Sequence, residues 1–582
     1  MKKGKRILGV LICFLAMVVC SLCFTAVEVD AVSETSRTDY TLMDGVTEST
    51  VYVTDSEGVN LQAHILRVQS GADVSFKATT KGYYSSGSTA KTRASKAKKW
   101  TSKSWGFKTL KNLAKDYNNS KDAVGTVIAA TNGDFYDKEK LKPLGTLVVE
   151  GNTLNKNNDE PFFAVLEDGS CDIYGKGGSI SDAVEVISGS RVLVAGGNNL
   201  VSDKEDTTRE PRQGIGICPD GTVVIINVDG RAPISAGASF YDFAEIFRQQ
   251  GCVRAINFDG GGSATFLTKR EGNSSLVYRN VKGDGFERKV TASLLVVRNS
   301  ESSGAEITGS PAVSMVEEGT ALVKKDGVWH YQIDGKPASG FYAINGKCYP
   351  FNSKGKGLSK KVKVGNVTYT FEKGKYKKAS DAKAGKVIIG YCGSVSGGKN
   401  LLYAYQYGNK KLKIGLNPLR TKKNGKMKNW NETTRLALPW YSMRGDIKNI
   451  YIGDGVTSVG SMFMYVAGGK VFDGTTIPTC QLTSVRLPSS LKTIGKYAFY
   501  NKPKLKNVNI PAKVTSVGVR AFAQSGKGYL RFKGSKVPKF GTKALTLTGF
   551  TKVYVKKNSA WKKFVKAGKF RKYGFKKTVS YK

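Results

Sequence analysis

Short apolar runs that end in polar or glycine-rich turns recur along residues 40–300. Such runs cover residues 59–68, 124–130, 212–217, 223–228 and 255–258, and their length and β-branched content are typical of buried strands. Residues 241–248 instead place apolar side chains at helical spacing, which predicts a helix that covers a sheet. The stretch 83–103, rich in Ser, Thr, Lys and Gly, predicts a mobile surface loop. We therefore predict a mixed α/β-sheet domain over residues 40–300.

Aromatic residues alternate with glycine turns after a predicted linker at residues 301–318. The segments 325–331, 340–342 and 345–351 have the spacing of hairpins, and residues 369–376 repeat the pattern less regularly. The pattern over residues 319–384 resembles the cell-wall-binding repeats of Gram-positive surface proteins, in which aromatic residues of neighbouring hairpins form ligand cages. Because fewer than two units are regular, we predict that Trp329, Tyr331 and Tyr342 are packing residues and that the segment is a spacer.

The last part of the chain, residues 385–582, repeats itself with a period of 23 residues. Residues 482–488 (LTSVRLP) match residues 505–511 (LKNVNIP), and residues 494–499 (IGKYAF) match residues 517–522 (VGVRAF). This period predicts a leucine-rich-repeat solenoid with a core of Leu, Ile and Phe side chains. The repeats resemble the BspA-type leucine-rich repeats of bacterial surface proteins. The whole chain is thus predicted to be a multidomain α+β protein.

A basic segment and an apolar run open the chain. Four Lys and Arg residues lie within the first six positions, and the apolar run over residues 7–27 is followed by small residues where a signal peptidase cuts. Residues 1–31 are predicted to be a secretory signal peptide, so we expect a secreted, extracellular or cell-wall-associated protein. Because the run approaches the length of a membrane span, an uncleaved anchor is the alternative.

The cysteine and histidine content argues against several kinds of site. The six cysteines beyond the predicted signal peptide are widely spaced and lack a CxxC pair, which argues against a disulfide scaffold or a structural zinc site. With only His64 and His330 in the chain, a histidine-based zinc site or a Ser-His-Asp triad is not expected. His64 lies in an apolar stretch and is predicted to be a strand residue with a hydrogen-bonded ring. Acid–base chemistry must therefore depend on carboxylates.

The formal charge of +45 is concentrated in the C-terminal repeats. Residues 401–582 contain 38 Lys and Arg against 4 Asp and Glu, which leaves +11 for residues 1–400. A basic region in a secreted protein indicates docking to an anionic surface, such as teichoic acid, capsule or mucin, and a protein partner of the repeats is compatible with this. Nucleic acid is not expected, because the lysines are spread rather than clustered with stacking aromatic residues.

Three predicted strand ends carry an aspartate beside a glycine. The longest of these turns, DGGGSAT, comprises Asp259, Gly260, Gly261, Gly262, Ser263, Ala264 and Thr265; the other two contain Asp134 and Asp229. Glycines allow a sharp turn, and an acid, open backbone amides and hydroxyls on one loop suit the binding and cleavage of an anion. The alternative for DGGGSAT alone is a tight turn with an N-capping aspartate.

Four segments together resemble the phosphodiester glycosidase family over roughly residues 40–300. They are TNGDF (131–135), PRQGIG (211–216), VDGR (228–231) and NFDGGGSAT (257–265), and ERKV (287–290) fits as well. Two positions depart from the family pattern: Asp134 stands where a small residue is usual, and Ala292 replaces an expected Asn.

The resemblance implies hydrolysis of a sugar-1-phosphodiester between the anomeric carbon and the phosphate oxygen. An ordinary glycosidase needs two carboxylates because its alkoxide leaves poorly. A phosphate monoester leaves readily as an anion, so one carboxylate suffices as nucleophile or as the base that activates water. The greater need is to hold the phosphate, which suits guanidinium groups and backbone amides.

The resemblance also implies roles for particular residues. Asp259 is the predicted nucleophile or base, and the amides of residues 260–263 with Arg212 or Arg231 are predicted to hold the phosphate. Asn132 and Asp229 would orient the sugar hydroxyls or the attacking water. The remaining candidates are Asp134 as a catalytic residue and Thr265, Phe135 and Arg288 as substrate-binding residues.

Two alternatives stay open. No metal ligands are assigned, but Asp229 and Asp259 offer oxygen ligands that would suit a divalent cation, Ca²⁺ or Mg²⁺. The chain could also be a non-catalytic adhesin whose glycosidase-like domain only binds glycans or host proteins. The intact aspartates and arginines favour the enzyme, and the two departures from the family pattern favour the adhesin.

Overall fold

The computed structural model of the chain describes residues 32–55, 57–202, 207–299, 313–314, 322–333, 336–344, 347–394, 398–420, 424–432, 434–466 and 476–582. The predicted signal peptide and most of the predicted linker lie outside the described residues. Within the described part, no helix is long and apolar enough to cross a membrane. Strands make up 40% of the described residues and helices 9%, so this part of the chain is mostly β-sheet, with fewer helices than the expected α+β class implies.

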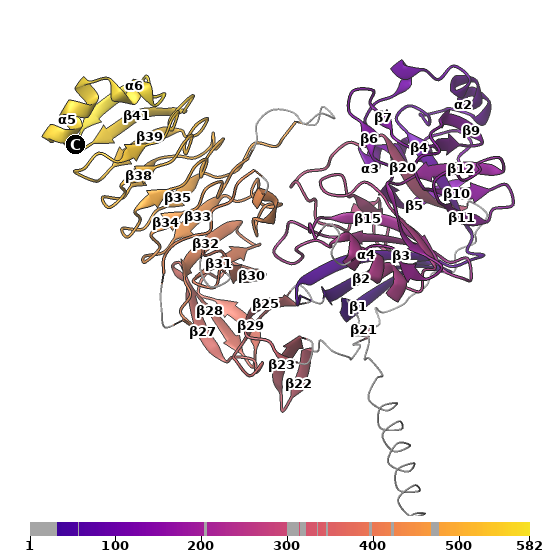
Figure 1. Cartoon of the computed structure of the whole chain (residues 1–582), viewed down its shortest axis with the longest axis horizontal. Coiled ribbons are helices and arrows are strands. Elements are labelled where there is room, and N and C mark those ends of the chain that lie inside the picture. Colours follow the sequence, from indigo (N-terminus) through magenta and orange to yellow (C-terminus); the bar gives the residue numbers. More distant parts are fainter. Residues whose placement is uncertain are drawn as a thin grey trace, which may run out of the picture. The chain divides into compact units, whose positions relative to one another are not determined.

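Three antiparallel sheets form the N-terminal region (Figure 1). The nine-stranded sheet has the order β14 (Asn198–Asn199), β13 (Arg191–Ala195), β17 (Arg254–Asn257), β15 (Arg212–Ile217), β16 (Val223–Val228), β3 (Asn60–Val68), β2 (Val46–Asp55), β1 (Val32–Met43), β21 (Val313–Ser314). One five-stranded sheet has the order β19 (Val277–Tyr278), β18 (Phe266–Thr268), β5 (Gly125–Asn132), β20 (Ala292–Asn299), β4 (Val74–Thr80). The other has the order β11 (Cys171–Tyr174), β10 (Phe162–Leu166), β12 (Ala183–Ser188), β8 (Leu147–Val149), β9 (Asn152–Asn155). A two-stranded sheet of β6 (Tyr136–Asp137) and β7 (Lys142–Pro143) completes this region.

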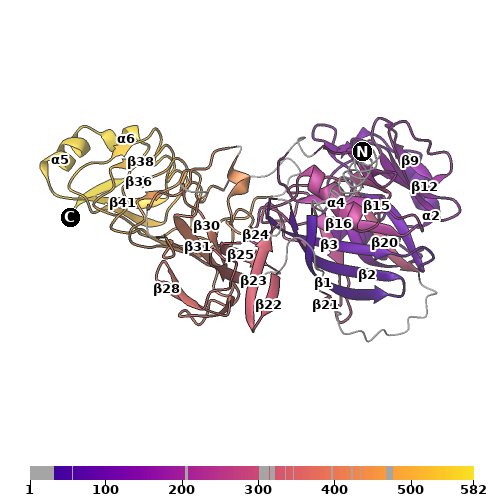
Figure 2. The same cartoon turned by 60° about the horizontal axis from the view of Figure 1, so that its bottom comes forward.

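The strands predicted at 59–68, 124–130, 212–217, 223–228 and 255–258 are confirmed as β3, β5, β15, β16 and β17. The predicted helix is confirmed as α4 (Phe240–Gln249), which packs on the sheet beside β13 and β16 (Figure 2). Glycines in β15 permit this packing. A Cβ on Gly214 would lie 3.1 Å from the Phe243 ring, and one on Gly216 would lie 2.8 Å from the Phe247 ring.

The prediction of a mobile loop at residues 83–103 was wrong. This stretch contains α2 (Ala90–Ala97) and a short 3₁₀ helix (Ser102–Ser104), and α3 (Leu110–Asn118) follows. Buried Arg93 of α2 donates to Glu150 and to Asp122, each at 2.7 Å at its shortest. Because these partners are distant in sequence, the Ser- and Lys-rich composition gave no sign of a helix.

Small hairpin sheets follow the N-terminal region. They are built from β22 (Leu322–Lys325), β23 (Val328–Ile333) and β24 (Lys336–Pro337); β25 (Gly340–Ile344) and β26 (Lys347–Phe351); and β27 (Lys360–Val364), β28 (Val367–Glu372) and β29 (Lys375–Ala379). The predicted packing role of the aromatic residues is confirmed. Tyr331 is fully buried and contacts Tyr342 edge-on, with ring centroids 5.1 Å apart, while Trp329 packs against the same cluster.

The C-terminal repeats begin with an antiparallel meander of β30 (Val387–Tyr391), β31 (Leu401–Gln406) and β32 (Lys411–Leu416). From β32 onwards neighbouring strands pair in parallel. The parallel strands β33 (Asn449–Ile452) and β35 (Ser484–Arg486) extend the sheet of this meander. A second sheet consists of β37 (Val508–Ile510), β39 (Gly528–Phe532), β41 (Phe550–Val555) and β42 (Thr578–Tyr581). A third consists of β34 (Ser458–Val459), β36 (Thr493–Ile494), β38 (Ser516–Val517) and β40 (Lys539–Phe540). Helices α5 (Ser559–Lys566) and α6 (Lys569–Lys572) lie near the end of the chain.

The core of these repeats contains the predicted apolar side chains. Leu482 and Leu505, one period apart, are both fully buried, and the rings of Phe499 and Phe522 stack with centroids 5.3 Å apart. Each repeat therefore buries equivalent residues against the next, which is what the 23-residue period predicts.

Candidate active site

The DGGGSAT turn connects two sheets of the N-terminal region. It leaves β17 of the nine-stranded sheet and enters β18 of a five-stranded sheet, where β18 pairs with β5. Gly261 has φ +59°, a Cβ on Gly260 would lie 2.6 Å from the Pro211 carbonyl oxygen, and one on Gly262 would lie 2.1 Å from Asp284 Oδ2. Backbone conformation or close packing thus requires a glycine at each position.

Asp259 lies at the start of this turn with 8% of its surface exposed. Its backbone N–H donates to the Gly133 carbonyl oxygen at 2.8 Å. Burial raises the pKa of its carboxyl to about 7, although the neighbouring Ser263 hydroxyl and the charges of Arg288 and Lys138 act to lower it. Near neutral pH the carboxyl can therefore exchange between its charged and neutral forms.

Asn132 holds the turn in place rather than facing a substrate. Its Nδ2 donates to the Asp259 carbonyl oxygen at 2.7 Å, and its Oδ1 accepts from the Thr265 N–H at 2.9 Å. Both ends of the turn are thereby tied to the last residue of β5. The prediction that Asn132 orients a sugar hydroxyl or water is replaced by a structural role, because both amide atoms are already bonded and the residue is 1% exposed.

Asp134 is a second buried carboxyl close to Asp259. One oxygen, Oδ2, accepts from the Gly145 N–H at 2.5 Å, while Oδ1 is buried without a partner among the described residues. Burial raises the pKa of Asp134 well above its ordinary value, and the negative charges of Glu160 and Asp259 raise it further. The charge of an ionised Asp259 thus disfavours ionisation of Asp134.

Asp229 lies beneath the turn and is fully buried. Its Oδ1 accepts from the Val281 N–H at 2.6 Å, and its Oδ2 lies 3.3 Å from His64 Nε2. Contrary to prediction, only one ring nitrogen of His64 has a hydrogen-bond partner, because Nδ1 is buried without one in the described part of the chain. These contacts give Asp229 a role in positioning the loop at Val281 and not the predicted contact with sugar or water.

Two predicted arginines converge on an aspartate that sequence reasoning missed. Arg231 donates through Nε to Glu210 at 2.6 Å and through Nη1 to Asp284 at 2.7 Å, and Arg288 donates through Nε to Asp284 at 2.7 Å. Burial alone would raise the pKa of Asp284, but Arg288 and Arg231 hold it below its ordinary value. An ionised Asp284 thus fixes both guanidinium groups beside the glycine turn, where a Cβ on Gly261 would lie 3.1 Å from Arg231 Nη2.

Arg212 is directed elsewhere. Its guanidinium lies 3.6 Å from the centroid of the Phe240 ring and donates to the carbonyl oxygens of Ala238 and Thr208 at 3.0 and 2.8 Å. Arg212 therefore secures the start of α4, and the prediction that it holds the phosphate is not supported by these contacts.

The backbone amides of the turn are partly occupied. The Gly261 N–H donates to the Pro211 carbonyl oxygen at 2.8 Å, and the Ser263 N–H donates to the Gly260 carbonyl oxygen at 3.1 Å. Of the four amides predicted to bind phosphate, those of Gly260 and Gly262 have no backbone acceptor among the described residues.

The hydroxyls and aromatic residues beside the turn differ in their availability. Thr265 Oγ1 donates to the Ser263 carbonyl oxygen at 2.9 Å, whereas the buried Ser263 hydroxyl lies beside the Asp259 carboxyl. Phe135 is half-buried, and the next residue, Tyr136, lies near Ser263, Arg288 and Asp259. Burial, followed by the charge of Asp259, raises the pKa of Tyr136. Tyr136 was not predicted because it follows the matched TNGDF segment.

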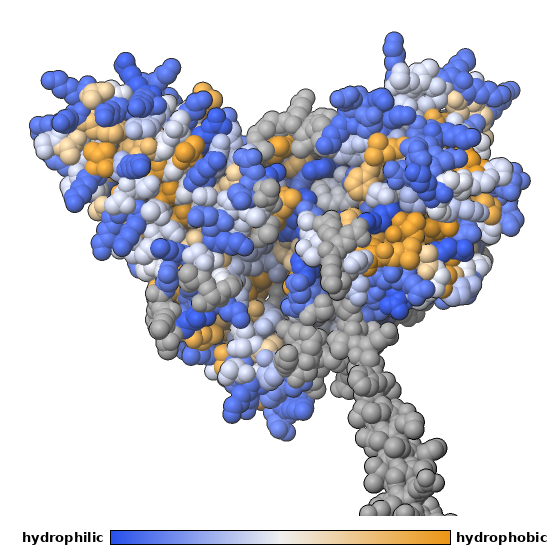
Figure 3. Space-filling view, viewed as in Figure 1, coloured by the Kyte–Doolittle hydropathy of each residue, from blue (hydrophilic) through white to orange (hydrophobic). Residues whose placement is uncertain are grey.

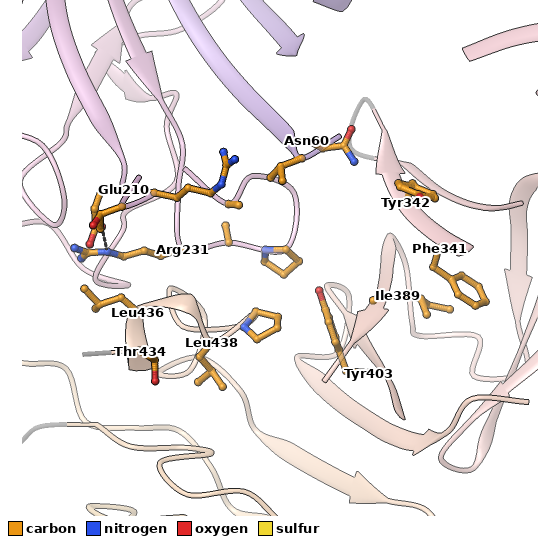
Figure 4. A pocket seen from close by; sticks show the side chains of 18 of the residues that line it. Asn60, Glu210, Arg231, Phe341, Tyr342, Ile389, Tyr403, Thr434, Leu436 and Leu438 are labelled. Atoms are coloured by element: carbon orange, nitrogen blue, oxygen red, sulfur yellow. Dashed lines mark hydrogen bonds and ion pairs between the residues drawn. The ribbon is translucent and has the colours of Figure 1, made fainter. Parts of the chain in front are cut away.

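A cavity of about 580 Å³ lies next to the Arg231–Glu210 ion pair. Figure 4 shows this ion pair at one side of the cavity and the rings of Tyr342 and Tyr403 on other parts of its lining. Asp259 does not line this cavity, whereas Arg231 does.

A metal site at Asp229 and Asp259 does not fit the arrangement of the described residues. They contain no group of three or more His, Cys, Asp and Glu side chains that could hold a metal ion. The Asp229 carboxylate is also already bonded to Val281 and His64. We therefore derive no step through a cation.

Two parts of the chain match known families. Residues 125–297 match the family Phosphodiester glycosidase, and residues 475–570 match the BspA type leucine rich repeat region in six copies. The SPbeta prophage-derived uncharacterized protein YomE of Bacillus subtilis is 37% identical over 142 residues, which cover 22% of this chain and 21% of that protein. The N-acetylglucosamine-1-phosphodiester alpha-N-acetylglucosaminidase of Mus musculus is 28% identical over 161 residues, which cover 24% of this chain and 31% of that protein. The chain thus spans less than a third of the length of either relative.

Two solved structures are also similar. The catalytic domain of zebrafish N-acetylglucosamine-1-phosphodiester alpha-N-acetylglucosaminidase, auto-inhibited by its pro-peptide, has a TM-score of 0.32 at 17% identity and covers 47% of this chain and 85% of that one. A leucine-rich repeat protein from Eubacterium ventriosum has a TM-score of 0.20 at 18% identity and covers 30% of this chain and 45% of that one. The family matches identify a phosphodiester glycosidase domain followed by a C-terminal region of BspA-type leucine-rich repeats.

Proposed function

We propose that the protein hydrolyses sugar-1-phosphodiesters of the N-acetylglucosamine-1-phosphate type, or sugar-phosphate polymers, with Asp259 as the catalytic residue. The observation that carries this proposal is a buried carboxyl with a pKa of about 7 at the start of a glycine turn, beside two arginines that a shared aspartate holds in place. This turn lies inside the segment that matches the phosphodiester glycosidase family.

The reaction proceeds by cleavage of the bond between the anomeric carbon and the phosphate oxygen. Ionised Asp259 either takes a proton from a water molecule that attacks the anomeric carbon, or attacks that carbon itself to form a glycosyl ester that water then hydrolyses. The electrons of the broken bond pass to the leaving oxygen, so a phosphate monoester departs as an anion. Arg288 and Arg231, with the Gly260 and Gly262 amides, stabilise the negative charge of the phosphate.

The active form of the enzyme has Asp259 ionised and Asp134 neutral. Burial raises the pKa of both carboxyls, and the charge of Asp259 raises the pKa of Asp134 further, which supports this assignment. Two carboxyls with separated pKa values are a common arrangement for acid and base roles in one site.

The proposed setting of the enzyme is outside the cell. The basic, apolar start of the sequence supports secretion or association with the cell wall, and the basic repeats support docking to an anionic surface polymer or to a protein.

Hydrolysis in ¹⁸O-labelled water tests which bond breaks. The full chain is incubated with a methyl diester of N-acetylglucosamine-1-phosphate, and the two products are separated and weighed. The proposal expects the label in the sugar and none in the methyl phosphate. Label in the phosphate would show attack at phosphorus and would contradict the proposed bond cleavage. A folded chain that binds the diester without releasing either product would support the adhesin.

A further inference from the structure

The parallel strands of the C-terminal repeats align one row of side chains, in which Lys413 is buried while Arg486 and Asn509 are exposed. Lys413 pairs with Tyr451 and Tyr451 with Arg486 in one sheet, while Arg531 pairs with Tyr554 in the next. The row, which we call the cation ladder, consists of Lys413, Tyr451, Arg486, Asn509, Arg531, Tyr554 and Ser580.

The ladder continues across the two sheets. Asn509 follows Arg486 by one 23-residue repeat and pairs with Arg531 in the second sheet. A hydrogen bond of 2.8 Å from the Lys506 N–H to the Thr483 carbonyl oxygen links the starts of these repeats. Neighbouring strands lie about 4.8 Å apart, so the ladder presents its side chains at short, regular intervals.

Tyrosine rings hold the cations of the ladder in position. The Arg486 guanidinium lies 4.4 Å and the Lys413 ammonium 5.2 Å from the centroid of the Tyr451 ring. The Arg531 guanidinium likewise lies 5.1 Å from the centroid of the Tyr554 ring. Such cation–π contacts restrict the cations without neutralising them.

The positive charge of the ladder is largely unbalanced. Residues 474–582 contain 26 Lys and Arg and no Asp or Glu. Arg486 has an ion pair with Asp454 at 3.3 Å, but Arg531 Nε is a buried donor without a partner among the described residues. Figure 3 shows mainly hydrophilic side chains on the visible face of this part of the chain. A bound anion would supply the acceptor that Arg531 lacks.

A depression of about 380 Å³ marks where such an anion would lie. Its lining includes Arg531, Lys533, Tyr554, Lys556 and Lys582 and contains no acidic side chain. A phosphate group in this depression would be within reach of several donors and of the tyrosine hydroxyl.

We propose that the cation ladder binds a linear glycan whose sugars are joined by phosphodiesters, with a phosphate in the depression at Arg531. The identity of this polymer depends on the proposed function, because the same chain carries a phosphodiester glycosidase domain. Cations that recur along the ladder can each form a charge-assisted hydrogen bond with a phosphate that recurs along the polymer. Nucleic acid fits less well, because its bases stack on open aromatic faces, and cations cover the ring faces of Tyr451 and Tyr554.

Binding of poly(N-acetylglucosamine 1-phosphate) to the full chain tests this proposal. The Asp259→Asn background prevents cleavage during the titration. Into it we would place a ladder variant, Arg486→Gln with Arg531→Gln, and a control variant that loses the same charge from exposed positions of α5, Lys562→Gln with Lys566→Gln. We expect at least tenfold weaker binding by the ladder variant and less than twofold weakening by the control.

A second variant guards against misfolding. Asn509→Glu places a carboxylate between the rungs of Arg486 and Arg531 without removing any cation, and we expect it to weaken binding as well. Equal losses in the ladder and control variants would overturn the proposal. So would tighter binding of single-stranded DNA of equal charge than of the polymer.

Turnover of a small diester separates this proposal from the proposed function. With Asp259 intact, the ladder variant should cleave a methyl diester of N-acetylglucosamine-1-phosphate as fast as the unmodified chain, because the ladder does not contact the glycine turn. Polymer binding that depends on the ladder, in a chain that cleaves no diester, would support the ladder and contradict the proposed function. Normal cleavage of the diester, with polymer binding that is equal in the ladder variant and in the chain with an intact ladder, would support the proposed function and contradict the ladder proposal.

Discussion

At the scale of single residues, two buried carboxyls determine the proposed chemistry. Asp259 has a pKa of about 7, and the pKa of Asp134 lies well above its ordinary value, with burial as the main cause for both. Because the charge of ionised Asp259 raises the pKa of Asp134 further, the site disfavours two negative charges on these side chains.

The pH dependence of the reaction should report the ionisation of Asp259. Since only the carboxylate can attack or activate water, kcat/KM for a small diester should rise from pH 5 to pH 8 with a midpoint near 7. The measurement is a pH–rate profile of the full chain, in which the ionisation of Asp259 should give the only ascending limb. A profile that is flat between pH 5 and 8 would contradict the assignment.

Asp134→Asn should keep that midpoint within about half a pH unit. A neutral Asp134 exerts no charge on Asp259, and asparagine preserves an acceptor for the Gly145 N–H. If neutral Asp134 supplies a proton to the leaving group, kcat should fall by about 10²-fold or more. A midpoint shifted well below 7 would show instead that Asp134 is charged in the native protein.

At the scale of elements, the site depends on how β5 and β17 are joined. Asn132, the last residue of β5, forms hydrogen bonds with the backbone at both ends of the glycine turn and thereby fixes the position of Asp259 between two sheets. The same turn needs glycine where it approaches Pro211 and Asp284.

Asn132→Ala should therefore affect both stability and activity. Two buried backbone groups would lose their partners, which costs about 2 to 4 kcal/mol of unfolding free energy. Urea titration measures this loss, and kcat should fall more than KM rises because Asp259 is misplaced. Asn198→Ala, at an exposed position of β14, is the control and should change stability by less than about 0.5 kcal/mol. Equal effects of the two substitutions would contradict the role of Asn132 in holding the turn.

The strands of the N-terminal region could be predicted because their signals are local. Residues 223–228 (VVIINV), which became β16, are almost wholly apolar, as a central strand requires, and the spacing of α4 shows its buried face. Helix α2 could not be predicted, since its one buried side chain, Arg93, depends on carboxylates brought in by distant parts of the chain.

The candidate site was predictable only in part for the same reason. The position of Asp259 and the need for glycine after it follow from a local strand-and-turn pattern. The partners of the arginines do not, because Arg212 meets Phe240 while Arg231 and Arg288 meet Asp284 only in the folded chain. Asp284 carried no motif that could have marked it.

At the scale of the whole molecule, the chain combines a nearly self-contained catalytic candidate with strongly basic repeats. Of the formal charge of +45, residues 1–400 contribute only +11. Under the proposed function, the repeats would concentrate an anionic polymer and the N-terminal domain would cleave it.

Salt should therefore affect polymer and small substrate differently. Raising NaCl from 50 to 500 mM should increase KM for poly(N-acetylglucosamine 1-phosphate) by about tenfold, because salt screens the exposed cations of the repeats. KM for the methyl diester should change by less than about threefold, since the arginines at the turn are largely buried. Equal salt effects on both substrates would indicate that the repeats take no part in substrate binding.

The most direct test of the account is the release of free N-acetylglucosamine from its 1-phosphodiester by the full chain and by Asp259→Asn. The substitution should also keep the protein folded. Because the pKa of Asp259 is raised in the folded protein, the fold loses stability as the pH rises above the ordinary carboxyl pKa, and this loss is complete above about pH 7. Asp259→Asn removes the ionisation, so the substitution should raise Tm more at pH 8 than at pH 5. The account predicts release by the unmodified chain and a loss of at least 10³-fold in the folded variant. Release that persists in folded Asp259→Asn would contradict it.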